Sequence, residues 1–330
     1  MGSVDPGIHA RHDMKEKLDG LIAAPFTALR PDGSLNLDLI ERQAGELAGN
    51  GVRGAFICGT TGEGFSLTSA ERMQVAERWL AVAPKQLAVI VHVAQNSVDE
   101  SRSLAAHAEQ IGAYAIASIG PTFFRPAGVE QLVDFCAPVA AAAPGLPFYY
   151  YHMPAMTGVN VPMIDFLRAA SKRIPNLAGL KFTDENLMSY VQCLNFEDGR
   201  FNILFGRDEI LLAALALGAT GAVGSTYNYM APIYQKVIEA YDAGDLEAAR
   251  RWQMASIEII AVMARHGGLP AGKAMMKMIG LDCGPVRAPL KNLSAGQHAS
   301  LQQDLAGVGF PARVPGNGGN LKHPEPLARV

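Results

Sequence analysis

A short apolar segment, LAGLKF at residues 177–182, has the character of a β-strand that is buried on both faces. Its apolar residues follow one another with little polar alternation, as in parallel strands that are covered on both sides. Seven further runs of this kind occur along the chain, at residues 21–24, 55–58, 87–93, 114–119, 148–151, 201–205 and 221–223. Stretches with helical spacing of apolar residues separate them, for example at 36–49. Eight strand–helix units of this size predict a (β/α)₈ barrel, also called a TIM barrel.

Helix-end signals support this alternation, since Thr68-x-x-Glu71 and Ser97-x-x-Glu100 match the capping box that begins many helices. A doubly wound open sheet is the alternative, but no GxGxxG motif follows the first predicted strand. After residue 243 the pattern predicts only helices, which we expect to be appended to the barrel, at 245–266, 270–279 and 294–306. The predicted organisation is a flexible leader at 1–17, the barrel at 18–243, a helical extension at 244–310 and a flexible tail at 311–330.

The composition argues against several classes of function. The 330 residues are 49% hydrophobic, and the net charge of −3 with a pI of about 6.2 offers no basic surplus for nucleic acid or anionic membrane. No apolar run reaches the length of a membrane span, and no signal-peptide apolar region follows the start. Cys58, Cys136, Cys193 and Cys283 lie far apart, as free thiols in a reducing compartment would. We expect a cytoplasmic protein that binds a small molecule and uses no metal or other cofactor.

Polar side chains stand where the predicted strands end, which is the catalytic face of this fold. Lys181 ends an apolar strand. Burial there would lower its pKa and supply the neutral amine that attacks a carbonyl, although the side chain could instead reach solvent. Tyr151 ends the preceding strand, about 4.8 Å away across a sheet, and its phenol could relay protons during carbon–carbon cleavage. At least one of Tyr149 and Tyr150 is expected to be barrel packing, because their side chains face opposite ways.

A glycine-rich loop, CGTTGEG at residues 58–64, follows the second predicted strand. Its open backbone N–H groups and the hydroxyls of Thr60 and Thr61 could together hold a carboxylate. Most glycine-rich loops are only turns, so this feature alone does not identify a site.

Two further strand ends carry groups that suit a polar ligand. The segment FGRDE at 205–209 contains Asp208, which could bind substrate or simply cap the next helix. Thr183 and the cluster STYN at 225–228 could bind hydroxyls or form caps and turns. An amine, a phenol, an anion-binding loop and a carboxylate pair on one rim are the parts needed for Schiff-base chemistry on a polyhydroxylated keto acid.

From residue 18 to 310 the chain resembles the N-acetylneuraminate lyase branch of the dihydrodipicolinate synthase superfamily. The motifs that carry the resemblance are GTTGEG at 59–64, YYYHMPAMTGV at 149–159, GLKFTD at 179–184, FGRDE at 205–209 and GAVGSTYNY at 221–229. The resemblance implies a homotetrameric class I aldolase that reversibly cleaves N-acetylneuraminate to pyruvate and N-acetylmannosamine. It also implies the residue roles: Lys181 forms the Schiff base, Tyr151 donates and accepts the proton, Thr60 and Thr61 bind the carboxylate, and Thr183, Gly206, Asp208, Glu209 and Ser225 hold the sugar.

Some positions depart from the family's pattern. Met156 stands where the related synthases usually carry an arginine for a second carboxylate, so condensation with aspartate semialdehyde is not expected. Arg207 stands where an uncharged residue is expected, and it could alter which sugar fits. Phe123 and Phe124 replace tyrosines of many members, one of which reaches a neighbouring subunit's site.

Three functions are therefore open. The first is the sialic acid lyase. The second is a lyase or dehydratase of the same superfamily acting on another 2-keto-3-deoxy sugar acid, with the dihydrodipicolinate synthase reaction less favoured. The third is a catalytically silent barrel that binds a keto acid, and the intact Lys181 and Tyr151 count against it. Asp208, Glu209 and Ser225 favour the first function over the second by resemblance.

Overall fold

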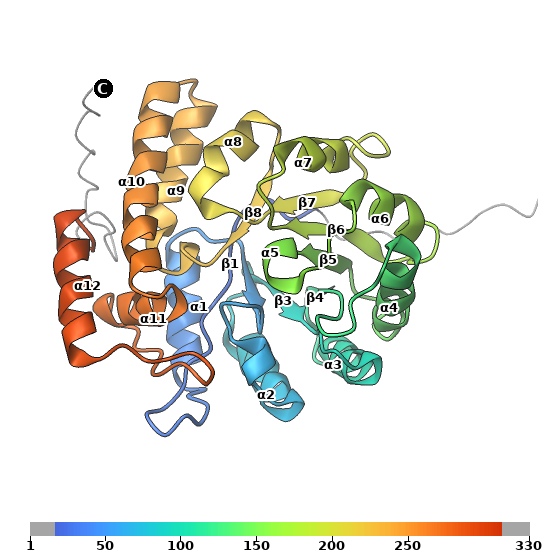
Figure 1. Ribbon diagram of the computed structural model, residues 1–330, viewed down its shortest axis with the longest axis horizontal. Helices are drawn as coiled ribbons and strands as arrows, with labels where there is room; N and C mark the ends of the chain where they lie inside the picture. The colour runs from blue at the N-terminus through green and yellow to red at the C-terminus, as the bar shows by residue number, and fades with distance from the viewer. Residues whose placement is uncertain (1–16, 312–330) are drawn as a thin grey trace, which may run out of the picture.

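Eight parallel strands close into a barrel at the centre of the computed structural model, which describes residues 17–311 (Figure 1). Strands adjacent in sequence are adjacent in the barrel, and β8 pairs with β1 to close it. The strands are β1 Gly20–Ala23, β2 Gly54–Ile57, β3 Ala88–His92, β4 Ala115–Ser118, β5 Phe148–His152, β6 Leu177–Phe182, β7 Asn202–Phe205 and β8 Gly221–Gly224. The predicted (β/α)₈ barrel is confirmed, and each predicted strand end lies within one residue of the observed end.

Helices surround the barrel, and those that follow β8 gather on one side of it (Figure 1). They are α1 Leu39–Gly49, α2 Ser69–Val82, α3 Val98–Gln110, α4 Val129–Ala141, α5 Pro154–Thr157, α6 Met163–Ala170, α7 Leu187–Leu194, α8 Leu211–Ala216, α9 Tyr227–Asp242, α10 Leu246–Arg265, α11 Leu269–Met278 and α12 Ala295–Gly307, with short 3₁₀ turns η1 Gly64–Ser66 and η2 Asp208–Ile210. The three helices expected after residue 243 correspond to α10, α11 and α12. Apart from residues 17 and 311, the predicted leader and tail lie outside the described residues.

The two expected capping boxes differ in the structure. Thr68 forms the full box with Glu71 at the start of α2. Ser97 accepts a bond from the backbone N–H of Glu100, but the Glu100 carboxylate accepts at 2.5 Å from Ser69 Oγ instead of returning to Ser97. The predicted capping box at Ser97 was therefore wrong in one of its two bonds, the return bond from the Ser97 backbone N–H to Glu100. The carboxylate instead accepts from Ser69 at the start of the neighbouring helix.

The alternation of side chains along β5 separates packing from chemistry. Tyr150 faces outward and packs on Phe166 with ring centroids 4.6 Å apart. Tyr149 and Tyr151 belong to the cluster inside the barrel, where Tyr149 donates to Asn202 Oδ1 at 2.9 Å. Packing by at least one of Tyr149 and Tyr150 is thus confirmed, and Tyr151 is the tyrosine of this strand that reaches the pocket at the rim.

Helix α10 joins the barrel through one apolar stripe. Trp252, Ala255, Ile259 and Val262 are buried, and their spacing places them on one face of the helix. This face holds α10 beside α9, and α12 packs on α10 in turn (Figure 1).

Within the described part of the chain, no helix combines the length and apolar character that crossing a bilayer requires.

A close approach of β6 and β7 leaves no room for a side chain at Gly179. A Cβ built there would lie 1.8 Å from the Asn202 carbonyl oxygen, its register partner's backbone. We predict that Gly179→Ala destabilises the protein by about 2 kcal/mol or more, because the strands must separate to admit the methyl group. Gly45→Ala is the control: this exposed position in α1 has open space around it, and alanine should stabilise the helix by about 0.5–1 kcal/mol. Thermal or urea unfolding measures both, and an unchanged stability of Gly179→Ala would contradict this packing.

Candidate active site

Lys181 and Tyr151 meet at the carboxyl end of the barrel because they are register partners on β6 and β5. Lys181 is only 4% exposed, so the alternative that it reaches solvent is wrong. Its Nζ lies 4.0 Å from the centroid of the Tyr151 ring and 4.1 Å from that of Phe56. The two aromatic faces remove the amine from water while still tolerating a positive charge.

The surroundings prepare the amine and the phenol for different tasks. Burial lowers the pKa of Lys181 to about 7, and the nearby Asp208 partly opposes this shift. Burial raises the pKa of Tyr151 to about 12. A large fraction of Lys181 is therefore neutral and nucleophilic near pH 7, whereas the Tyr151 phenol keeps its proton.

The Tyr151 hydroxyl is held between two neighbours. It lies 3.3 Å from Thr60 Oγ1 and donates to Met153 Sδ at 2.9 Å. His92 packs edge-on against the Tyr151 ring, with centroids 5.8 Å apart. The phenol is thus aimed at the glycine-rich loop and at the cavity above Lys181.

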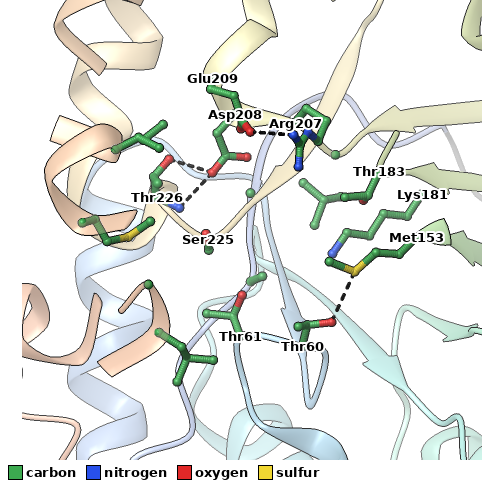
Figure 2. Close-up of a pocket in the computed structure, with 18 of the residues that line it drawn as sticks. Thr60, Thr61, Met153, Lys181, Thr183, Arg207, Asp208, Glu209, Ser225 and Thr226 are labelled. Carbon is green, nitrogen blue, oxygen red and sulfur yellow. Dashed lines mark hydrogen bonds and ion pairs between the residues drawn. The ribbon is translucent and has the colours of Figure 1, made fainter. Parts of the chain in front are cut away.

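A cavity of about 370 Å³ opens above Lys181, and the side chains around it come from opposite sides of the barrel (Figure 2). All nine site residues expected from the sequence line it: Lys181, Tyr151, Thr60, Thr61, Thr183, Gly206, Asp208, Glu209 and Ser225. Their meeting in one cavity is a finding about position.

Asp208 is a buried carboxylate that faces the cavity. It accepts from the backbone N–H of Thr226 at 3.0 Å and from Thr226 Oγ1 at 2.7 Å, so the alternative that it caps the following helix is wrong (Figure 2). Burial raises its pKa to about 6 against the lowering effect of the Thr226 bonds. The Thr183 hydroxyl is buried, and it packs so closely on Gly206 that a Cβ there would meet it at 2.0 Å.

Arg207 is a cation on the cavity wall that is already paired. It contacts the carboxylate of Glu185. It also contacts the carboxylate of Glu209, at 3.1 Å (Figure 2). Two carboxylates therefore share one guanidinium, and the expected extra cation is offset before any ligand arrives.

Several residues that line the cavity could not be recognised from the sequence. Met153 directly follows β5, and five others come from α10, from α11 and from the turn between these helices, at Ile260, Met263, Ala264, Gly268 and Leu269. Their apolar spacing is that of ordinary core residues, so no local signal distinguishes them. The helices expected to be mere additions to the barrel thus complete the wall of the cavity.

Across residues 17–311, no cluster of three or more His, Cys, Asp or Glu side chains is arranged to hold a metal.

Comparison with known proteins identifies the family. Residues 17–307 match the model of the Dihydrodipicolinate synthetase family. The chain belongs to this family. It is 41% identical over 302 residues to the N-acetylneuraminate lyase of Gallus gallus. The matched residues cover 90% of this chain and 98% of that relative.

Solved structures of this family agree with that relationship. The N-acetylneuraminate lyase of Proteus mirabilis superimposes with a TM-score of 0.87 at 43% identity, covering 89% of this chain and 100% of that one. The N-acetylneuraminate lyase (sialic acid aldolase) of Aliivibrio salmonicida gives a TM-score of 0.88 at 43% identity, with coverages of 91% and 100%.

The lowered pKa of Lys181 predicts how its reactivity depends on pH. The rate at which pyruvate and borohydride label Lys181 should rise about tenfold per pH unit below the pKa of about 7 and level off above it, because only the neutral amine attacks a carbonyl. Asp208→Asn should move the midpoint to lower pH, since Asp208 raises the Lys181 pKa. Labelling rates measured across the pH range test both statements. A midpoint near the ordinary value of 10.5 would show that the amine is solvated.

Proposed function

We propose that the protein reversibly cleaves N-acetylneuraminate to pyruvate and N-acetylmannosamine through a Schiff base on Lys181. The observation that carries the proposal is a buried, partly neutral lysine against a tyrosine ring, beneath a cavity that has hydroxyl donors at one end and carboxylates at the other. The relatives reported above, named as lyases of this substrate, support the same reaction.

In the first half of the proposed mechanism, the neutral Lys181 amine attacks the keto carbon C2 of the sugar acid to give a carbinolamine. Tyr151, which holds its proton at neutral pH, gives that proton to the departing hydroxyl. Water leaves, and a protonated Schiff base forms beside the phenolate. The positive nitrogen of this Schiff base is the acceptor for the electron pair released in the next step.

In the second half, the Tyr151 phenolate takes the proton of the C4 hydroxyl while the C3–C4 bond breaks. The bonding pair moves into the Schiff base to form an enamine, and the C4 end departs as an aldehyde. Tyr151 then returns its proton to C3. Water adds to the resulting pyruvyl Schiff base, the phenolate takes up the released proton, and free pyruvate and the neutral Lys181 amine are restored.

Substrate orientation follows from the two ends of the cavity. Thr60 and Thr61 would hold the single carboxylate close to Lys181. The opposite end would hold the sugar hydroxyls, through Thr183, Gly206, Asp208, Glu209 and Ser225. Carboxylates there suit hydroxyl donors and would repel a second carboxylate.

A second candidate is a lyase or dehydratase that acts on an acidic keto-deoxy sugar, because Arg207 lines the cavity. Its pairing with Glu185 and Glu209 weighs against this candidate, since the guanidinium is already neutralised. Met156 is 66% exposed and does not line the cavity, so it offers nothing to the second carboxylate of an aspartate semialdehyde adduct.

We further propose that the protein works in the cytoplasm as a homotetramer. All four cysteines are free and buried, as suits a reducing compartment. Phe123 and Phe124 are 79% and 84% exposed on the rim side of β4, and apolar side chains this exposed favour contact with another subunit.

Tyr151→Phe should reduce carbon–carbon cleavage by roughly 10²–10⁴-fold, because it removes the group that relays the proton. Imine formation with pyruvate should persist at a lower rate. The matched control is Tyr150→Phe on the same strand, whose ring packs outward on Phe166 and which should keep near-normal turnover. Steady-state cleavage of N-acetylneuraminate measures both variants. Turnover of Tyr151→Phe within about threefold of the unmodified protein would mean that this tyrosine only packs.

Steady-state kinetics on a panel of keto-deoxy acids tests the substrate. The specificity constant kcat/KM for N-acetylneuraminate should exceed that for a hexarate-derived keto-deoxy acid by about tenfold or more, because the site offers acceptors for hydroxyls and no free cation. Condensation of pyruvate with aspartate semialdehyde should be negligible. A tenfold preference for the hexarate-derived acid would replace this proposal with the second candidate.

A further inference from the structure

The loop that carries Thr60 and Thr61 contains a residue in an unfavourable backbone conformation. Glu63 has a φ of 52°, in the left-handed region that side-chain-bearing residues avoid. Its backbone N–H nevertheless donates to the Thr60 carbonyl at 3.1 Å and closes the turn that contains both threonines. Such a conformation persists only where the surrounding structure holds it.

The holding contacts come from the C-terminal part of the chain. Glu63 Oε1 forms an ion pair at 2.7 Å with Lys273 Nζ on α11, and the two side chains are 2% and 3% exposed. Glu63 Oε2 accepts from the backbone N–H of Arg287 at 2.8 Å. Lys273 also donates to the Pro285 carbonyl at 2.6 Å. The Glu63 carboxylate is therefore bound both by α11 and by the segment that follows it.

These contacts connect the C-terminal part of the chain to the loop through both the side chain and the backbone of Glu63. The Glu63 side chain is bound on both oxygens, while its backbone sets the position of Thr60. Arg287 also donates to the Ser66 carbonyl at 2.9 Å, at the end of the same loop. Helix α11 itself begins at the cavity, which Leu269 lines.

We propose that Glu63 and Lys273 are positioning residues that fix the carboxylate-binding loop from α11, so that affinity for 2-keto acids depends on their buried ion pair. The inference rests on the proposed function, since it takes Thr60 and Thr61 as the carboxylate site. Loss of the pair would let the turn relax, and a displacement of about 1 Å at a binding group is enough to weaken its action severely. The burial of the Lys181 amine would be spared, because the rings of Phe56 and Tyr151 that enclose it stand on β2 and β5 and not on the loop.

Lys273→Met tests the inference, with Lys277→Met on the same helix as the matched control. Lys277 is 67% exposed and pairs with Asp282 at the surface, so its replacement should change nothing measured here. For Lys273→Met, the pyruvate concentration that gives half-maximal borohydride labelling of Lys181 should rise about tenfold or more. The labelling rate at saturating pyruvate should stay within about threefold, which a general loss of structure would not allow.

A second variant covers the case in which a lone buried Glu63 prevents folding. Glu63→Gln with Lys273→Met removes both charges, keeps an acceptor for the Arg287 N–H, and should show the same loss of affinity. If either variant melts at a lower temperature but binds pyruvate as the unmodified protein does, the pair is only structural and the inference fails. If the unmodified protein is not labelled at all, the proposed function fails with it.

Discussion

The chemistry of this site depends on taking one lysine amine out of water. A buried ammonium loses hydration worth several kcal/mol, which favours the neutral amine at a pH where an ordinary lysine stays charged. The barrel makes this possible, because Tyr151 and Lys181 are register partners and Phe56 closes the other side of the amine. The neighbouring Asp208 limits the shift, so the pKa of Lys181 settles at about 7 and does not fall further.

The rest of the cavity is organised around that amine by charge. One end offers neutral donors from the glycine-rich loop, and the other offers the carboxylates of Asp208 and Glu209, each already engaged by Thr226 or Arg207. A ligand with one carboxylate and many hydroxyls matches both ends, whereas a diacid would meet like charge at the far end. In the proposed reaction, the same geometry that makes the lysine nucleophilic would also select the kind of keto acid that binds.

Much of this could be predicted from local sequence, because strands buried on both faces are apolar runs and the catalytic face lies at their ends. Lys181 was predictable as an amine at the end of such a run. The environment of Asp208 could not be predicted, because its partner Thr226 lies on the next strand-to-helix connection. A helix cap would explain the local sequence pattern equally well. The contributions of Met263 and Leu269 were also hidden, because a cavity-lining face of a helix has the same spacing as a core-facing one. The Glu63–Lys273 pair joins distant segments, and only the folded chain brings them together.

In the proposed function, Lys181 is the residue that bonds covalently to the substrate. Incubation with pyruvate and borohydride, followed by peptide mass mapping, tests it most directly. We expect one reduced pyruvyl group per chain, on the peptide that contains Lys181, and no adduct in Lys181→Arg, whose guanidinium stays protonated. An adduct on another lysine, or labelling that survives Lys181→Arg, would contradict it.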